Sequence, residues 1–137
     1  MTASTIVNTG LPPRLHMSRT KGSRYKTGHP DAICVKRPTH PNAHPRYGNP
    51  WHVEHIQAEH GISKDEARRI AADLYARWLD GDPDLAHVEP ERRQWILDNL
   101  HQLAGHPLGC SCDLPAPGQV DHCHAAVLIA LANKPTR

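Results

Sequence analysis

Three stretches after residue 60 repeat apolar residues at helical spacing. The first begins at Ser63, with Glu66 three positions later as in a capping box, and ends before Gly81 and Pro83. Its apolar positions are Ala67, Ile70, Ala71, Leu74 and Trp78. Two more helices are predicted over about residues 91–103, following Pro90, and over about residues 121–132.

Two short apolar runs predict strands. Residues 32–37 (AICVKR) lie between Pro30 and Pro38, and residues 108–112 (LGCSC) follow Pro107. Residues 39–50 are rich in Pro, Gly, Asn and His, which is typical of a loop. Strand, helices, strand and helix in that order are typical of a small α/β domain. We therefore predict one α/β domain over residues 14–134, with a short central sheet and about three helices packed on it. Residues 1–13 show no periodicity and are expected to be a flexible leader.

Composition adds two constraints. The chain has 137 residues, is 38% apolar and lacks Phe, so its core is thin and its stability is expected to depend on a metal or a partner. It has no apolar run of about 18 residues and no secretion-signal pattern at its start, so we expect a cytoplasmic protein without a membrane partner. In a reducing compartment its four cysteines are expected to be thiols or metal ligands.

Charge is distributed unevenly along the chain. Residues 1–50 carry eight Lys/Arg and one acidic residue, a net charge of +7, whereas residues 51–137 have a net charge of −5. A basic front half predicts a phosphate-bearing partner, either a nucleotide or a nucleic acid. A solvated basic tail explains the same bias.

Four ligand-type residues fall within fifteen positions near the C-terminus. Cys110 and Cys112 share one face of the predicted strand, and Cys123 and His124 lie at the predicted strand-to-helix turn. Three thiolates and an imidazole are a standard ligand set for Zn²⁺, which makes zinc the predicted metal. The C-x-C spacing is tighter than usual, so the fourth ligand could also be one of these histidines: His122, His40, His44 or His52.

The same cluster has two other interpretations. A thiol at the start of a helix is close to unpaired N–H groups, which favour the thiolate, so Cys123 with His124 can be a catalytic pair. Alternatively, the cysteines are small buried apolar residues. The residues alone leave all three interpretations open.

A set of short motifs in fixed order resembles domain-of-unknown-function family 4326, which is common in tailed bacteriophages and also found in bacteria. The resemblance covers about residues 14–133. The residues that carry it are Arg19, Lys21, Gly22 and Arg24; Arg37 and Pro38; Tyr47, Gly48, Asn49, Pro50 and Trp51; Tyr75 and Trp78; Leu108, Cys110 and Cys112; and Cys123, His124 and Leu128.

The chain departs from the family pattern around its aromatic residues. Ser23 and Ser111 stand where aromatics are usual, Tyr47 and Trp51 replace a Trp and a Phe, and residues 41–45 lengthen one loop. The resemblance implies a phage-type accessory protein acting in the host cytoplasm. It does not imply a specific activity.

The polar motifs complete a hypothesis about ligand binding. Arg19, Lys21 and Arg24 around Gly22 are expected to hold phosphate, since Arg binds it bidentately and Gly lets the backbone approach. Arg37 and Asn49 are expected to line the same site. Taken alone, the turn Gly48-Asn49-Pro50 is more typical of a structural role in which the Asn49 side chain caps the local backbone. Tyr75 and Trp78 are expected in the core.

Motifs of several well-known enzyme classes are missing. The chain has no H-E-x-x-H helix, and it lacks the complete zinc-deaminase signature because no P-C-x-x-C segment is present. Three hypotheses follow: a nucleotide or nucleic-acid-end enzyme or binding domain, a non-catalytic zinc-stabilised module that binds a host protein or a nucleic acid, and an interaction protein with structural cysteines. The sequence leaves open whether the protein is an enzyme and what its oligomeric state is.

Overall fold

The computed structural model describes residues 11–16, 31–35, 46–110 and 114–134. Within them lies a three-stranded parallel sheet made of β1 (Arg14–His16), β2 (Ile33–Cys34) and β3 (Leu108–Cys110), in the order β1-β3-β2. With the helices described below, it confirms the prediction of a small α/β domain. Strand β1 was not predicted, because three residues within a basic segment are too few to show an alternating pattern.

The register of the sheet aligns the ends of its strands. β3 pairs with β1 from Arg14↔Leu108 to His16↔Cys110, and with β2 through Ile33↔Leu108 and Cys34↔Gly109. All three strands therefore run in one direction and end at one edge, the carboxyl edge of the sheet. Cys110 is the last residue of the central strand.

The described residues contain four α-helices. They are α2 (Val53–His60), α3 (Lys64–Asp80), α4 (Pro90–Asn99) and α5 (His124–Ala132), with short 3₁₀ helices η1 (Pro83–Leu85) and η2 (Leu100–Leu103). Helix α3 and the continuous α4–η2 segment match two predicted helices. The prediction lacked α2, whose single buried residue, Ile56, gives little apolar periodicity.

Helix α5 begins three residues later than predicted, because Cys123 is extended and serves as its N-cap residue.

Both ends of α3 are closed by specific contacts. The hydroxyl of Ser63 accepts a hydrogen bond from the Glu66 amide at 3.1 Å, as the capping-box spacing predicts. Gly81 ends the helix at φ 95°, a left-handed conformation that favours glycine. Arg93 of α4 donates to the backbone carbonyls of Trp78 and Leu79, in the last turn of α3, at 2.6 and 3.0 Å, which fixes α4 against the end of α3.

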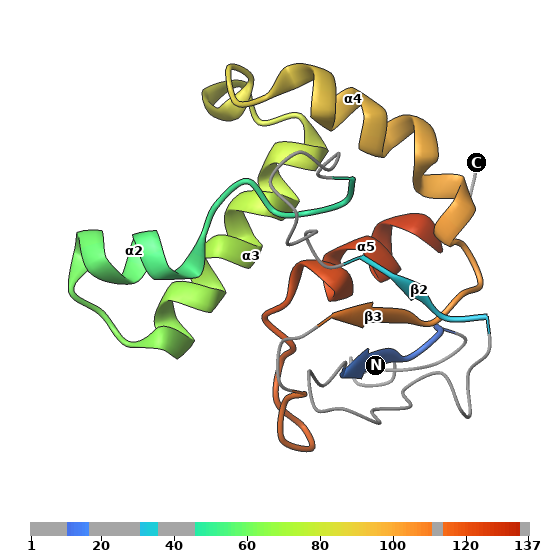
Figure 1. Cartoon of the computed structure of the whole chain (residues 1–137), viewed down its shortest axis with the longest axis horizontal. Coiled ribbons are helices and arrows are strands. Elements are labelled where there is room, and N and C mark those ends of the chain that lie inside the picture. The colour runs from blue at the N-terminus through green and yellow to red at the C-terminus, as the bar shows by residue number, and fades with distance from the viewer. Residues whose placement is uncertain (1–10, 17–30, 36–45, 111–113, 135–137) are drawn as a thin grey trace, which may run out of the picture.

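Helix α5 is the centre of the fold. It lies between the sheet and helices α3 and α4 (Figure 1). The largest fully buried side chains come from all these layers: Trp78, Tyr75, Ile96, Leu103, Leu108 and Leu128. Tyr75 and Trp78 are thus core residues, as expected from their helical spacing. In the part of the chain described, no helix is long and apolar enough to cross a membrane.

The central position of α5 predicts a strong effect of truncating it. Leu128→Ala is expected to lower the free energy of unfolding by about 2–5 kcal/mol, because Leu128 is fully buried. Leu114→Ala is the matched control, since Leu114 is 53% exposed and its truncation is expected to cost less than about 0.5 kcal/mol. Urea denaturation measures both variants, and equal losses would contradict this account of the core.

Candidate functional site

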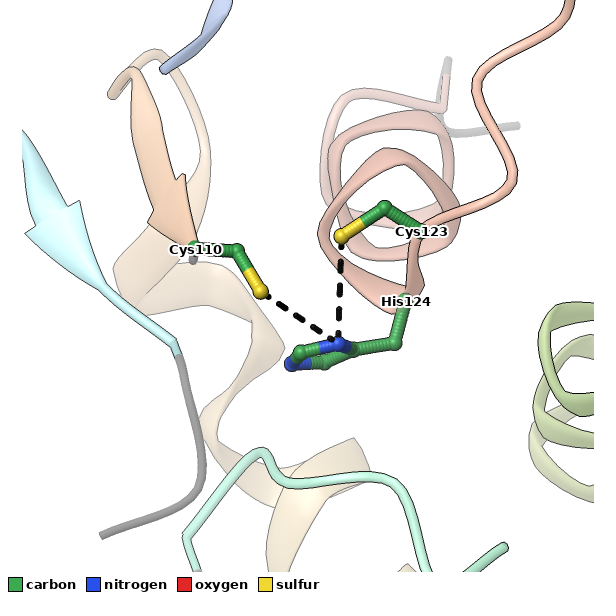
Figure 2. Close-up of side chains that lie close together, drawn as sticks. All are labelled: Cys110, Cys123 and His124. Carbon is green, nitrogen blue, oxygen red and sulfur yellow. Dashed lines mark hydrogen bonds between the residues drawn. The ribbon is translucent and has the colours of Figure 1, made fainter. Parts of the chain in front are cut away.

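The structure brings Cys110, Cys123 and His124 together at the carboxyl edge of the sheet. Figure 2 shows Cys110 reaching from the end of β3 toward the start of α5, where Cys123 and His124 point back at it. The Nδ1 atom of His124 lies 3.9 Å from Cys110 Sγ and 4.0 Å from Cys123 Sγ, and the three ligand atoms are all within 4.8 Å of one another. We call these three residues the Cys/His cluster. Cys110 and Cys123 are only 3% and 2% exposed, so both sulfurs lie inside the protein.

One hydrogen bond fixes the orientation of the imidazole. His124 Nε2 lies 2.7 Å from the backbone carbonyl of Val35, directly after β2. A carbonyl only accepts, so Nε2 carries the proton and donates it. In the neutral ring Nδ1 is then the unprotonated nitrogen, and its lone pair faces the two thiols. The cluster therefore offers two sulfurs and one nitrogen to a common point.

A buried tyrosine forms the wall beside the imidazole. The ring of Tyr75 meets that of His124 edge-on, with centroids 5.5 Å apart and planes at 87°. Its hydroxyl donates to the carbonyl of Tyr47, which connects α3 to the turn before α2. Burial raises the pKa of the Tyr75 hydroxyl well above its usual range, and the nearby Arg92 guanidinium opposes part of that rise. Tyr75 is therefore a neutral donor throughout the ordinary pH range.

The turn at residues 47–51 is held by its own polar groups. Asn49 donates from its side-chain amide to the carbonyl of Ala71 at 3.0 Å and accepts from the Trp51 amide at 2.9 Å. Arg92 donates to the carbonyl of Gly48. The described contacts of Asn49 thus anchor the turn on α3, and its predicted role as a ligand-binding residue stays a prediction.

Most of the other predicted site residues lie outside the described residues. These are Arg19, Lys21, Arg24, Arg37 and Cys112, together with His40 and His44. Of the alternative fourth ligands, His52 precedes α2 and stacks on His55, and His122 lines a groove with Ser63 and Glu66. Neither belongs to the Cys/His cluster, which is the one metal-ligand group found among the described residues.

The geometry of the cluster fits a metal ion. Around a tetrahedral Zn²⁺, bonds of about 2.3 Å to sulfur and about 2.0 Å to nitrogen place S and N about 3.6 Å apart. The observed separations of 3.9 and 4.0 Å exceed this by less than half an ångström. Histidines that bind metals usually donate their other N–H to a carbonyl or carboxylate, as His124 does to Val35. Three described side chains could hold a metal.

The chain matches the profile of a known protein family. The sequence profile of the family described as "Domain of unknown function (DUF4326)" matches residues 15–134. The chain belongs to this family. The match spans nearly all the described elements and includes every member of the Cys/His cluster. No curated protein and no solved structure matches the chain.

Two parts of the site were not predicted from the sequence. The Val35 carbonyl is a backbone group, and no residue type marks a backbone acceptor. Tyr75 was expected in the core, and its contact with His124 depends on α3 packing against α5. The clustering of Cys110, Cys123 and His124 was predicted, and the structure places them together as expected.

The raised pKa of Tyr75 predicts a specific loss of stability at high pH. Above about pH 10 the unfolded chain ionises this hydroxyl while the native state keeps its proton. Stability contributed by Tyr75 is therefore complete below that pH and falls as pH rises, by up to about 1.4 kcal/mol per pH unit. Urea denaturation between pH 8 and about 11 is expected to give a shallower decline for Tyr75→Phe. Parallel declines for the variant and the wild type would contradict the assignment.

Proposed function

We propose that this domain binds a phosphate-bearing ligand, a nucleotide or a nucleic acid, at the carboxyl edge of its sheet. The observation that carries the proposal is the convergence of β3, α5 and the residue after β2 on the Cys/His cluster. In α/β folds with parallel strands, ligands bind outside the carboxyl ends of the strands. The Cys/His cluster lies at this position.

The order of elements along the chain supports a phosphate-bearing ligand. β1 ends at His16 and continues into the segment that contains Arg19, Lys21 and Arg24, and β2 is followed within three residues by Arg37. All four cations therefore follow the carboxyl ends of strands. Arginine and lysine near a shared edge supply the positive potential that attracts phosphate.

The Cys/His cluster can have one of two roles in this ligand site. Cys123 with His124 as a catalytic pair makes the protein an enzyme acting on the bound nucleotide or nucleic-acid end. If the cluster only stabilises the edge of the sheet, the protein is a binding domain without catalysis. The family resemblance to phage proteins extends the proposal to a small accessory protein in the cytoplasm of an infected host.

Binding measurements with charge-matched variants test the phosphate proposal. Arg19→Ala/Arg24→Ala removes two predicted contacts, and Lys64→Ala/Lys134→Ala removes two exposed cations elsewhere. We expect only the first variant to weaken binding of a labelled single-stranded oligonucleotide, measured by fluorescence anisotropy. Its log–log salt slope should be smaller in magnitude by about 1.4, about 0.7 for each lost phosphate contact.

Calorimetry with a nucleoside triphosphate and with inorganic phosphate separates a nucleotide site from a nucleic-acid site. Equal weakening in both variants, or no binding of any of the three ligands, would reject the proposal.

A second candidate function is a zinc-stabilised module that binds a host protein or a nucleic acid without catalysis. The observation that favours it is the tautomer of His124, whose Nδ1 faces both sulfurs while Nε2 donates to Val35. Cys112 is the proposed fourth ligand, two residues after Cys110. Bound Zn²⁺ would join β3 to α5 and supply the support that a thin core requires.

Metal analysis tests this second candidate. Protein purified without added metal is expected to contain about one Zn²⁺ per chain, and chelation is expected to lower its unfolding midpoint. Cys123→Ser should abolish stoichiometric metal, whereas Cys34→Ser is the control because Cys34 is an exposed cysteine outside the cluster. Well under one metal per chain in the wild type would remove this function.

A further inference from the structure

A partly buried ion pair joins the first strand to the residues that lead into α5. Arg14 donates from Nε and Nη2 to the two carboxylate oxygens of Asp121 at 2.8 and 2.7 Å, a bidentate arrangement. The side chains are 4% and 18% exposed, and the two residues are 107 positions apart in the sequence. Neither residue belongs to the Cys/His cluster.

The ion pair is offset by two residues from the Cys/His cluster, both along the sheet and along the chain that leads into α5. On the sheet, Arg14 is aligned with Leu108, and Cys110 follows Leu108 by two residues. On the other segment, Asp121 precedes Cys123 by two residues. The pair and the cluster are thus two successive links between the sheet and the chain that enters α5.

The residues just before Asp121 are mostly exposed, so they are poorly suited to fix the position of the cluster. Leu114 and Val120 are exposed, and the residues between them are mostly exposed as well. At Asp121 the chain becomes partly buried, and two residues later Cys123 is almost fully buried. Asp121 is therefore the point at which the returning chain is fixed to the sheet.

An ion pair that is mostly shielded from solvent is a costly way to hold two segments, because both charges lose much of their hydration. Replacing such pairs with apolar residues is often neutral for stability or stabilising. Its advantage over apolar packing is direction: a bidentate Arg–carboxylate contact has one geometry and does not slide. The ion pair is therefore better suited to fix the position of the chain that enters α5 than to raise the free energy of unfolding.

We propose that Arg14 and Asp121 are positioning residues that set the distance of Cys123 and His124 from Cys110. The proposal depends on the metal centre proposed above only for the measurement of Co²⁺ binding. Alkylation of the two thiols tests it in metal-free protein.

The test replaces the ion pair with apolar side chains. Arg14→Met/Asp121→Leu is expected to keep the wild-type unfolding midpoint and to bind Co²⁺ at least about tenfold more weakly, with altered thiolate-to-cobalt absorption, as for other contacts that orient metal ligands. Arg69→Met/Glu66→Leu is the control, since it removes an exposed, hydrogen-bonded Arg–Glu pair on α3. The control is expected to retain wild-type affinity.

The second readout is native alkylation of metal-free protein by iodoacetamide, resolved by peptide mass spectrometry. Cys110 and Cys123 should react at least about tenfold faster in Arg14→Met/Asp121→Leu than in the wild type, and exposed Cys34 serves as the internal standard. A wild-type protein that binds no Co²⁺ would reject the metal centre alone, because alkylation still reports the positions of the thiols.

Should the apolar pair fail to fold, Arg14→Lys gives the same test, because it retains the charge and loses the bidentate geometry. Faster alkylation at an unchanged unfolding midpoint supports positioning. A folded variant with wild-type alkylation rates, or rates that rise only as the midpoint falls, would overturn the proposal.

Discussion

The hydrogen bond from His124 to the carbonyl of Val35 is the contact on which the candidate site depends. It decides which imidazole nitrogen keeps its proton, and so directs the Nδ1 lone pair toward Cys110 and Cys123. It also joins the start of α5 to the end of β2, while β3 contributes Cys110 beside it (Figure 2). One ring therefore links three elements, and whatever displaces it changes both the chemistry of the site and the packing around it.

The aromatic residues support this arrangement through their polar atoms. With no Phe in the chain, the buried rings are tyrosine and tryptophan, and three of them donate to backbone carbonyls. Tyr75 donates to Tyr47, Tyr47 to Asn99 and Trp78 to Val88, so each ring fills the core and also holds a connecting segment. A core short of apolar volume gains order from these directional contacts. The turn at residues 47–51 is fixed to α3 and α4 in this way.

The two proposed functions use the same edge of the sheet for different reasons. The three parallel strands all end there, and Arg19, Lys21, Arg24 and Arg37 follow β1 and β2 in the sequence. The cluster offers a soft, partly enclosed ligand set at the same place. A metal there would strengthen the connection between β3 and α5, and a phosphate ligand would use the positive potential of the segments beyond the strands. Binding of one does not exclude binding of the other.

The sequence by itself determined the local features. Ser63 with Glu66, Gly81 and Pro90 mark helix ends through contacts within a few residues, and the α/β class follows from the order of apolar patterns. The grouping of Cys110, Cys123 and His124 was also predictable, because a strand and the helix after it lie side by side. Strand β1, the Arg14–Asp121 pair and the tautomer of His124 were decided only by the tertiary structure. Each depends on groups far apart in the chain, 107 residues for the ion pair and 89 for His124 and Val35, and no local pattern records such contacts.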